Sequence, residues 1–420
     1  MSFYDYQGNE IKVGTSADVD TGLPVVSIDG TLPTSKNDGN VNVVITYKSA
    51  SENFQKYATL KVQGDSSTLY PKKNFTVKLY SDSERTTKYK VAFRDWDKTS
   101  KFVLKANWVD HSHARNIVNA RLWTQIYKSR SDYDNLPTAL KESYFAVDGF
   151  PVKVYANGIY MGVYTWNRPK DSMYGLKDSI ETNSMIQGYG SYGGANLWRS
   201  STYDNKWEEQ IHDEVFTAST IAGLNRALNF VYTSSDTDFV NNFSDYFDKQ
   251  SIIDQYIFLY AACIVDNLAK NQTYFTYDSQ KWFGGMYDLD GTWGCPPYPP
   301  AKSTWYDYNT EFQSGYTAVT DGDKVTTNLL YERVQNLLTS EIKTRYAELR
   351  TTVLSEGNID GEFERFMSEI PPYIYEEDYA STTGDGAFTN IPLKTSNNIL
   401  QIRQFVKDRL AYVDEQIEAL

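Results

Sequence analysis

Four side chains in the C-terminal half of the chain have the types and spacing that phosphoryl transfer requires. Asp266 and Asn271 are five residues apart and follow an apolar run, and Asp288 and Asp290 come later, in YDLDGTWG. In one class of phosphoryl-transfer site, an Asp accepts the proton of the attacking hydroxyl, while an Asn and a later Asp bind Mg²⁺ on the phosphates. Mg²⁺ prefers hard oxygen ligands of this kind. The spacing predicts Asp266 as the base and the other three as metal ligands, all in one cleft.

The spacing alone leaves other interpretations open. An Asp followed by an Asn arises by chance in an acidic chain, and DLDG also fits an exposed turn, a capped strand end or a structural Ca²⁺ site. Ile264 and Val265, rather than the His-Arg of protein kinases, precede Asp266. Three glycines match G-x-G-x-x-G but do not lie between two strands, which favours a flexible loop over a phosphate clamp; they are Gly188, Gly190 and Gly193.

Phosphate binding also needs a lysine from another part of the chain. Residues 60–80 predict a strand, a loop of small residues and a second strand that carries Lys72, Lys73 and Lys78. Strand alternation puts Lys73 on the face of Phe75 and the other two lysines on the opposite face. Because a buried unpaired ammonium is costly, we expect Lys73 to be the more buried lysine and to have Asp288 or Asp290 as its partner.

The elements that must position these side chains fall into two halves. Alternating apolar and polar residues predict strands before residue 60, at 101–108 and at 151–164, the last as a hairpin around Asn157-Gly158. A helix is predicted to start in DHSHARN, with Asp110 or Ser112 as its N-cap. Beyond Pro169 the pattern predicts helices at about 206–232, 236–266, 326–355 and 361–370, and a terminal helix.

This pattern predicts an α+β fold with a mainly β N-terminal lobe and a mainly α C-terminal lobe. The expected divisions are residues 1–41 as a β segment and candidate docking arm, 42–168 as the first lobe and 169–420 as the second. The helix that starts near residue 112 is the exception within the first lobe.

Composition excludes several classes of function. The 41 basic and 54 acidic residues give a net charge of −13, which argues against broad binding to nucleic acid or to an anionic membrane. Two cysteines and three histidines supply neither a disulfide framework nor a zinc cluster. The most apolar stretch, residues 252–265, is too short and too polar for membrane insertion. The N-terminus has no signal-peptide pattern, which predicts a cytoplasmic protein unless the chain is part of a virion.

Five ordered segments resemble the CotH kinase family of spore-coat and secretory kinase-like proteins. They are QGDSSTLYPKKNFTVKLY, KFVLKANWVDHSHARNIVNARL, VKVYANGIYMGVY, IVDNLAKNQTYFTYDSQKWFGGMYDLDGTWG and RQFVKDRLAYVDEQI. The resemblance implies an atypical two-lobed protein-kinase-like fold, ATP and Mg²⁺ as cofactors, and phosphorylation of a protein substrate.

Residue by residue, the resemblance implies a catalytic Asp266 and a metal held by Asp288 with Asn271, with Asp290 as a further ligand. A lysine of residues 72–78 would contact the nucleotide. Arg115 and Asn116 match a family pair, for which two interpretations stay open. Arg115 contacts the nucleotide, or both residues lock a helix N-terminus to the sheet.

Two departures from the family pattern bear on activity. Gln63 replaces an Arg, and TWNRPKD has Arg168 near the place where the family has a Glu. Since kinases pair their nucleotide lysine with a Glu, Arg168 would put positive charge beside that lysine. We therefore expect slow or absent kinase turnover unless another acid, such as Asp171, substitutes.

The N-R-P-K-D version resembles the branch of the family found among phage and prophage structural proteins. That resemblance implies a virion component of the tail or baseplate, with other virion proteins as partners and a homo-oligomer left open. Aromatic residues make up 15% of the chain, with 34 tyrosines, which suits assembly surfaces or sugar contact. Three hypotheses stay open: an active kinase, a structural or host-binding protein with a degenerate kinase site, and a carbohydrate-binding module.

Overall fold

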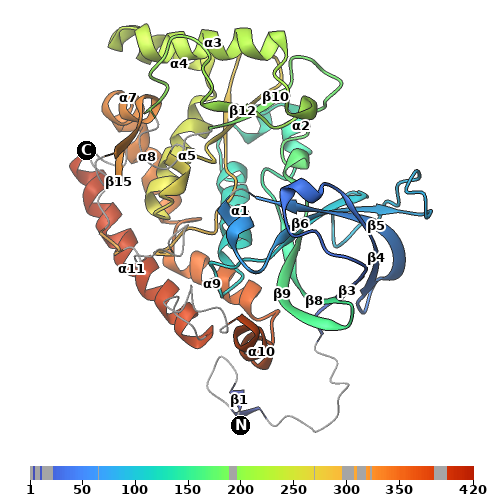
Figure 1. The fold of residues 1–420 in the computed structure, drawn as a ribbon. Coiled ribbons are helices and arrows are strands. Elements are labelled where there is room, and N and C mark those ends of the chain that lie inside the picture. The colour runs from blue at the N-terminus through green and yellow to red at the C-terminus, as the bar shows by residue number, and fades with distance from the viewer. Residues whose placement is uncertain are drawn as a thin grey trace.

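A closed β-barrel forms the N-terminal part of the molecule and lies beside a group of helices (Figure 1). The computed structural model describes residues 3–4, 10–11, 22–64, 66–188, 196–268, 270–295, 307–309, 318–321, 324–382 and 395–420. The barrel strands are adjacent in the order β3-β4-β5-β6-β7-β9-β8, and parallel pairing of β3 with β8 closes the ring. Their bounds are β3 (Val25–Asp29), β4 (Val41–Lys48), β5 (Asn53–Gln63), β6 (Asn74–Tyr80), β7 (Lys101–Lys105), β8 (Gly149–Ala156) and β9 (Ile159–Asn167).

Alternating burial explains why these segments form a barrel. In β4, Val43, Ile45 and Tyr47 are buried, whereas the residues between them are partly exposed. They join the inward residues of the other strands in one hydrophobic core that includes Trp166. The strands predicted before residue 60 and at 151–164 are confirmed, whereas the strand predicted at 101–108 ends at Lys105.

The predicted β8–β9 hairpin is also confirmed. Ala156 pairs with Ile159, so only Asn157 and Gly158 form the loop, with φ angles of 49° and 80°. Both φ angles are positive, as a type I′ turn requires. The Asn157 side chain also accepts a hydrogen bond from the backbone N–H of Gly30 at 3.0 Å, which ties the turn to the end of β3.

The helices bury their apolar side chains in a second hydrophobic core. In the described part of the chain they are α1 (Arg115–Lys128), α2 (Thr138–Lys141), α3 (Ala218–Thr233), α4 (Asp236–Tyr246), α5 (Lys249–Ala261), α7 (Leu329–Leu337), α8 (Thr339–Arg350), α9 (Glu356–Met367), α10 (Pro372–Thr382) and α11 (Thr395–Ala419). Although α1 precedes residue 168, Ile117 and Trp123 belong to this helical core because α1 packs against α5 and α9. The fold is a mixed α/β one with a closed β-barrel.

Three helical stretches differ from the prediction, and the one predicted at 326–355 forms two helices, α7 and α8. Residues 236–266 form α4 and α5, and the side chain of Asp248 accepts a hydrogen bond from the N–H of Ser251 at the start of α5. The helix expected from about residue 206 begins only at Ala218, after a Thr217 cap and a short strand.

Short strands outside the barrel form small separate sheets. β10 (Ser184–Gly188), β12 (Trp207–Glu209), β13 (Thr273–Thr276) and β14 (Phe283–Gly285) form a small antiparallel sheet. The remaining strands are β1 (Phe3–Tyr4), β2 (Glu10–Ile11), β11 (Asn196–Leu197), β15 (Ala318–Asp321) and β16 (Lys324–Asn328). Among the described helices, none combines the length and the apolar character that crossing a membrane requires.

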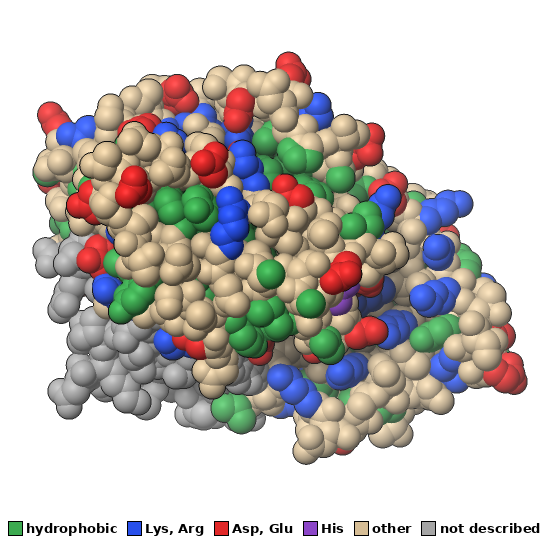
Figure 2. Space-filling view, turned by 90° about the horizontal axis from the view of Figure 1, so that it is seen from above, with side chains coloured by type: hydrophobic (Ala, Val, Ile, Leu, Met, Phe, Trp, Pro, Cys, Tyr) green, Lys and Arg blue, Asp and Glu red, His purple; other side chains and the backbone are tan. Residues whose placement is uncertain are grey.

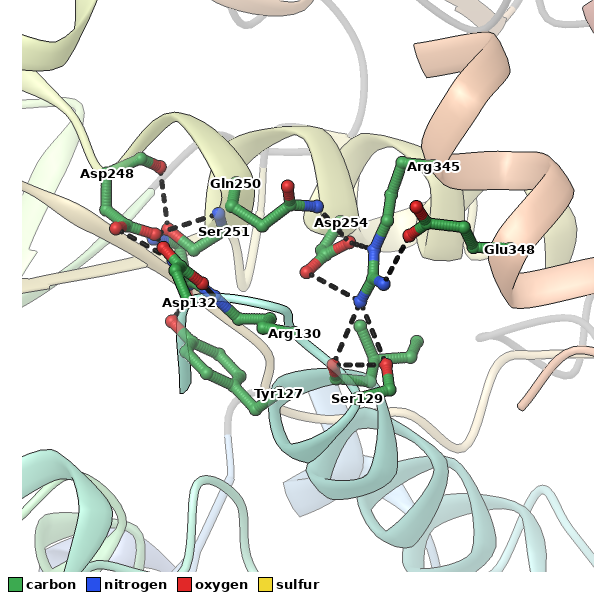
Figure 3. Close-up of polar contacts among 12 residues, drawn as sticks. Tyr127, Ser129, Arg130, Asp132, Asp248, Gln250, Ser251, Asp254, Arg345 and Glu348 are labelled. Carbon is green, nitrogen blue, oxygen red and sulfur yellow. Dashed lines mark hydrogen bonds and ion pairs between the residues drawn. The ribbon is translucent and has the colours of Figure 1, made fainter. Parts of the chain in front are cut away.

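Buried ion pairs join α5 to α8 and to the C-terminal end of α1 (Figure 3). Arg345 of α8 pairs with Asp254 of α5 at 2.7 Å, and Arg130, just after α1, pairs with Asp248 at 2.6 Å. Both acids lie on or at the start of α5, so these pairs fix the helix that leads into the candidate site.

Candidate functional site

Asp266 lies just beyond α5, where the chain leaves the helical core. It begins a short 3-10 helix (Asp266–Leu268), and Asn271, with φ 59°, turns the chain into β13. The Asn271 amide donates a hydrogen bond to Asp266 Oδ2 at 2.8 Å and accepts one from Gln187 of β10 at 2.8 Å. Asp266 Oδ1 is buried and accepts no hydrogen bond from any described residue. One carboxylate oxygen is therefore held, and the other is left for a ligand.

The surroundings of Asp266 make its carboxyl group less acidic than usual. Burial raises the pKa of Asp266 to about 6; Lys270 opposes this change and Asp288 adds to it. A general base works best when its pKa lies near the working pH. Asp266 is thus able to accept a proton near neutral pH.

Asp288 and Asp290 lie on a loop that follows β14, and the residues on both sides of Asp288 are tied down. The carbonyl of Tyr287 accepts a hydrogen bond from the Asn267 amide at 2.8 Å, and the N–H of Leu289 donates to Asn116 Oδ1 at 3.0 Å. This leaves the carboxylate of Asp288 in a defined position.

Arg115 and Asn119 support the same loop from α1. The Arg115 guanidinium is fully buried, pairs with Asp110 at 2.6 Å and donates to the carbonyl of Thr292 at 3.0 Å. Asn119 accepts a hydrogen bond from the indole of Trp293 at 2.8 Å. The structure gives Arg115 protein partners at the back of the loop, which favours the structural interpretation of the Arg115–Asn116 pair over nucleotide contact.

Asp110 also explains how α1 begins. Its carboxylate accepts a hydrogen bond from the N–H of Arg115 at 2.8 Å, and Ser112 Oγ accepts one from the N–H of Ala114 at 3.2 Å. The prediction of Asp110 or Ser112 as the N-cap is nevertheless wrong, because the N-cap position is Ala114, which forms no side-chain capping bond; the two side chains lie just before it and bind the first backbone N–H groups.

The lysine that reaches the acids is Lys105, which the sequence interpretation missed. Lys105 is the last residue of β7. Its Nζ atom lies 2.6 Å from Asp288 Oδ1 and forms an ion pair with it. Phe102 and Leu104 point into the barrel, so Lys101 and Lys105 lie on the outer face of the strand. The alternation in KFVLK could have indicated this face. Lys101 pairs there with Asp171 at 2.5 Å.

The predicted lysines lie elsewhere, and the expected order of burial is wrong. Lys72 is buried, whereas Lys73 is partly exposed and donates to the carbonyls of Thr68 and Tyr70; Lys78 is exposed. The physical reason is that β6 begins only at Asn74, so strand alternation does not extend to residues 72 and 73. The expected pairing of Lys73 with Asp288 or Asp290 is replaced by the pair of Lys105 with Asp288.

Lys72 belongs to a buried cluster around Asp378 of α10. Asp378 accepts hydrogen bonds from Lys72 at 3.1 Å, from His113 Nε2 at 2.8 Å and from the N–H of Val163 at 2.7 Å. Burial alone would raise the pKa of Asp378, but Lys72 and His113 hold it well below its usual range. The cluster ties α10 to β9 and leaves Lys72 engaged by an acid other than Asp288.

Gly162 makes room for this cluster, so we expect Gly162→Ala to destabilise the protein. Gly162 has φ 101°, and an added Cβ would lie 2.3 Å from Asp378 Oδ1. Gly158→Ala is the matched control because Gly158 also has a positive φ but has no atom within 4 Å of an added Cβ. Chemical denaturation should show an additional loss of about 2–3 kcal/mol for Gly162→Ala, from the displaced ion pair. Equal losses for the two variants would contradict this role of Gly162.

Arg168 lies among aromatic side chains just after β9. Its side chain lies over the rings of Tyr144 and Trp96, and burial lowers its pKa to about 10 against the pull of Tyr144 and Asp148. The described contacts thus put Arg168 beside aromatic rings and acids.

Lysines surround the aspartates of the site. Lys170 donates to Gln210 and lies 5.1 Å from the ring centroid of Tyr287. Burial alone would raise the pKa of Asp288, but Lys105, Lys270 and Lys170 hold it below its usual value. Figure 2 shows Lys and Arg side chains gathered around a recess on the barrel side of the molecule. In an acidic protein, this local positive charge suits a phosphate-bearing ligand.

Asp290 differs from Asp288 in its protonation. Burial and the neighbouring Asp288 raise the pKa of Asp290 to about 7, although Lys105 opposes this change. Two aspartates of one loop therefore have pKa values on opposite sides of the usual range, which is typical of functional sites.

Two oxygen donors of the candidate site have the chemistry that Mg²⁺ on a nucleotide uses. No three His, Cys, Asp or Glu side chains gather as metal ligands within the described ranges. Mg²⁺ on a nucleotide needs only one or two carboxylates, because phosphates and water complete its coordination. Asp288 and the amide oxygen of Asn271 are hard donors that suit this arrangement. Of the G-x-G-x-x-G match, Gly188 ends β10, whereas Gly190 and Gly193 lie outside the described residues.

Comparison with known proteins identifies the family. None of the curated proteins matches this chain. The family model described as CotH kinase protein matches residues 60–413, a range that contains the barrel strands β6 to β9, the acids of the site and most of the helices. The chain therefore belongs to the CotH kinase protein family.

Proposed function

We propose that this CotH-family protein binds a nucleoside triphosphate with Mg²⁺ where the barrel meets the helices and transfers a phosphoryl group to a protein hydroxyl. The observation that carries the proposal is the ion pair between Lys105 of the barrel and Asp288, at 2.6 Å, beside Asp266. Phosphoryl transfer requires a base, metal-binding oxygens and a phosphate-binding lysine in one place.

In the proposed reaction, Asp266 acts on the acceptor. The oxygen of the acceptor hydroxyl forms a bond to the γ-phosphorus, and Asp266 Oδ1 accepts the hydroxyl proton. The bond between the γ-phosphorus and the bridging oxygen breaks, and the nucleoside diphosphate leaves with that oxygen. Asn271 keeps Asp266 oriented, and Asp288 with Asn271 would hold the metal. Bound Mg²⁺ would neutralise charge on the phosphates. Lys105 binds a phosphate oxygen.

We also propose that the barrel and the helical part are the two lobes of a kinase-like fold. The two separate hydrophobic cores support this division, and α1 belongs to the helical lobe by its packing. The site residues come from both parts, since Lys105 lies on β7 and Asp288 follows β14.

A nucleotide titration tests the proposed function. We expect ATP to bind to the wild type more tightly with Mg²⁺ than without it, by isothermal calorimetry. Asp288→Asn should lower the Mg²⁺-dependent affinity by about tenfold or more, because a charged ligand becomes neutral. Asp134→Asn, at an exposed position, is the control and should bind as the wild type does. Failure of the wild type to bind ATP with Mg²⁺ would refute the proposal.

A virion role is a second proposal, and the N-R-P-K-D sequence of residues 167–171 carries it. We propose that the protein is a tail or baseplate component that contacts other virion proteins. Mass spectrometry of purified phage particles tests this role, and absence of the chain from the particles would refute it. All eight tryptophans that the structure describes are buried, so they give no support to the carbohydrate-binding alternative.

A further inference from the structure

We infer that Lys105 occupies the cation position of Asp288 in the ligand-free protein, so that a metal ion binds there only when a nucleotide draws Lys105 away. This inference rests on the proposed function and predicts the order in which the ligands bind, since the metal ion needs the nucleotide. Metal and nucleotide should bind cooperatively, with little metal bound alone.

The geometry of the ion pair is the first observation. Lys105 Nζ lies 2.6 Å from Asp288 Oδ1, and the Lys105 side chain is only 13% exposed. An ammonium at this distance occupies the place that a cation on Asp288 would take. A divalent ion beside it would meet repulsion, because the ammonium is largely shielded from water, although the Asp288 side chain is 30% exposed.

The second observation concerns which partner can move. Hydrogen bonds fix both neighbours of Asp288, through the Tyr287 carbonyl and the Leu289 N–H. Lys105 instead holds its charge on a flexible four-carbon stem at the end of β7. Exchange at this position therefore means that the lysine leaves and the carboxylate stays.

The third observation is the partner of the Lys105 ammonium, which forms an ion pair with the Asp288 carboxylate. If the charged Lys105 side chain moves away from Asp288 and meets no other anion, it loses its closest ion-pair partner. A nucleotide phosphate supplies that anion, so nucleotide and metal should strengthen each other's binding by the same factor.

Lys101 offers a matched control on the same strand face. Lys101 also forms an ion pair, with Asp171, but both side chains are about two-fifths exposed, at 40% and 38%. Removing either lysine deletes one positive charge near the site, whereas only Lys105 contacts Asp288.

The test measures Mn²⁺ binding by electron paramagnetic resonance, first without nucleotide. We expect Lys105→Met to bind Mn²⁺ about tenfold or more tightly than the wild type, because an opposing charge at contact distance is removed. Lys101→Met should change this affinity by less than about threefold, as screening at an exposed position predicts. Lys105→Gln serves as a second variant, and circular dichroism checks that each variant folds.

Adding ADP to the same samples separates the inference from the proposed function. ADP should tighten Mn²⁺ binding in the wild type more than in Lys105→Met. Equal Mn²⁺ binding by the wild type and both Lys105 variants without nucleotide would overturn the inference, even if ADP binds. Tighter binding by these variants, with no ADP binding by any protein, would support the lysine's role but refute the proposed function.

Discussion

Asp266→Asn is expected to lower the rate of phosphoryl transfer by about 10²–10⁴-fold, the range that a general base contributes. The substitution retains the size of the side chain and an oxygen for the hydrogen bond from Asn271. It removes only the ability of Asp266 to take the acceptor's proton. Transfer from labelled ATP to protein measures the loss, and calorimetry should show nearly unchanged nucleotide affinity.

The pH dependence of the reaction gives an independent readout of Asp266. Only the ionised carboxylate accepts a proton, and burial places its pKa at about 6. In the wild type, kcat/KM should therefore rise as pH increases through about 6 and then level off, since this ratio reports groups of the free enzyme. Asp266→Asn should remove this rise.

Asp171→Asn is the control, because Asp171 pairs with Lys101 rather than with Asp266 or Asn271. Strong Mg²⁺-dependent transfer by the wild type that Asp266→Asn abolishes and Asp171→Asn leaves intact would refute the hypothesis of a degraded site. Transfer that survives in Asp266→Asn would instead contradict the assignment of the base. Arg168 lies over the rings of Tyr144 and Trp96, so the same assay should be repeated with Arg168→Gln to ask whether its charge slows the reaction.

Local patterns predict the barrel strands and the acids of the site because their physical causes are local. Alternation along a strand and the two positive φ angles at Asn157-Gly158 depend on a few neighbouring residues. The spacing of Asp266 and Asn271 likewise fits one short turn, in which their side chains bind each other. Such features can be inferred from a single segment.

Pairings between distant segments could not be predicted in the same way. Lys72 and Asp378 are 306 residues apart, and Lys105 and Asp288 are 183 apart. Which lysine meets which acid depends on where β6 begins and on how the loop after β14 is tied to α1. The packing of α1 in the helical core has the same origin, since its partners α5 and α9 follow much later in the chain.

Arg345→Met is expected to lower the free energy of unfolding by about 3–5 kcal/mol, because it leaves Asp254 buried without its charged partner. Asp254 is 1% exposed, and Arg345 Nε lies 2.7 Å from its carboxylate. Arg345 also donates to Ser129 Oγ at 2.9 Å at the end of α1 (Figure 3). Arg199→Met, which breaks an exposed pair with Glu332, is the control and should cost about 0–1 kcal/mol in urea denaturation.

The effect of pH identifies Asp254 as the source of this loss. Burial raises the pKa of Asp254 to about 6 in spite of Arg345, and without the arginine the pKa should rise further. A carboxyl group whose folded pKa exceeds its unfolded value binds more protons in the folded state, so stability falls as pH rises through that interval. Arg345→Met should therefore lose less stability at pH 5 than at pH 8, and the variant Asp254→Leu/Arg345→Met should recover part of the loss at pH 8. If Arg345→Met costs no more than Arg199→Met, or costs the same at both pH values, the ion pair does not hold α5 and α8 together.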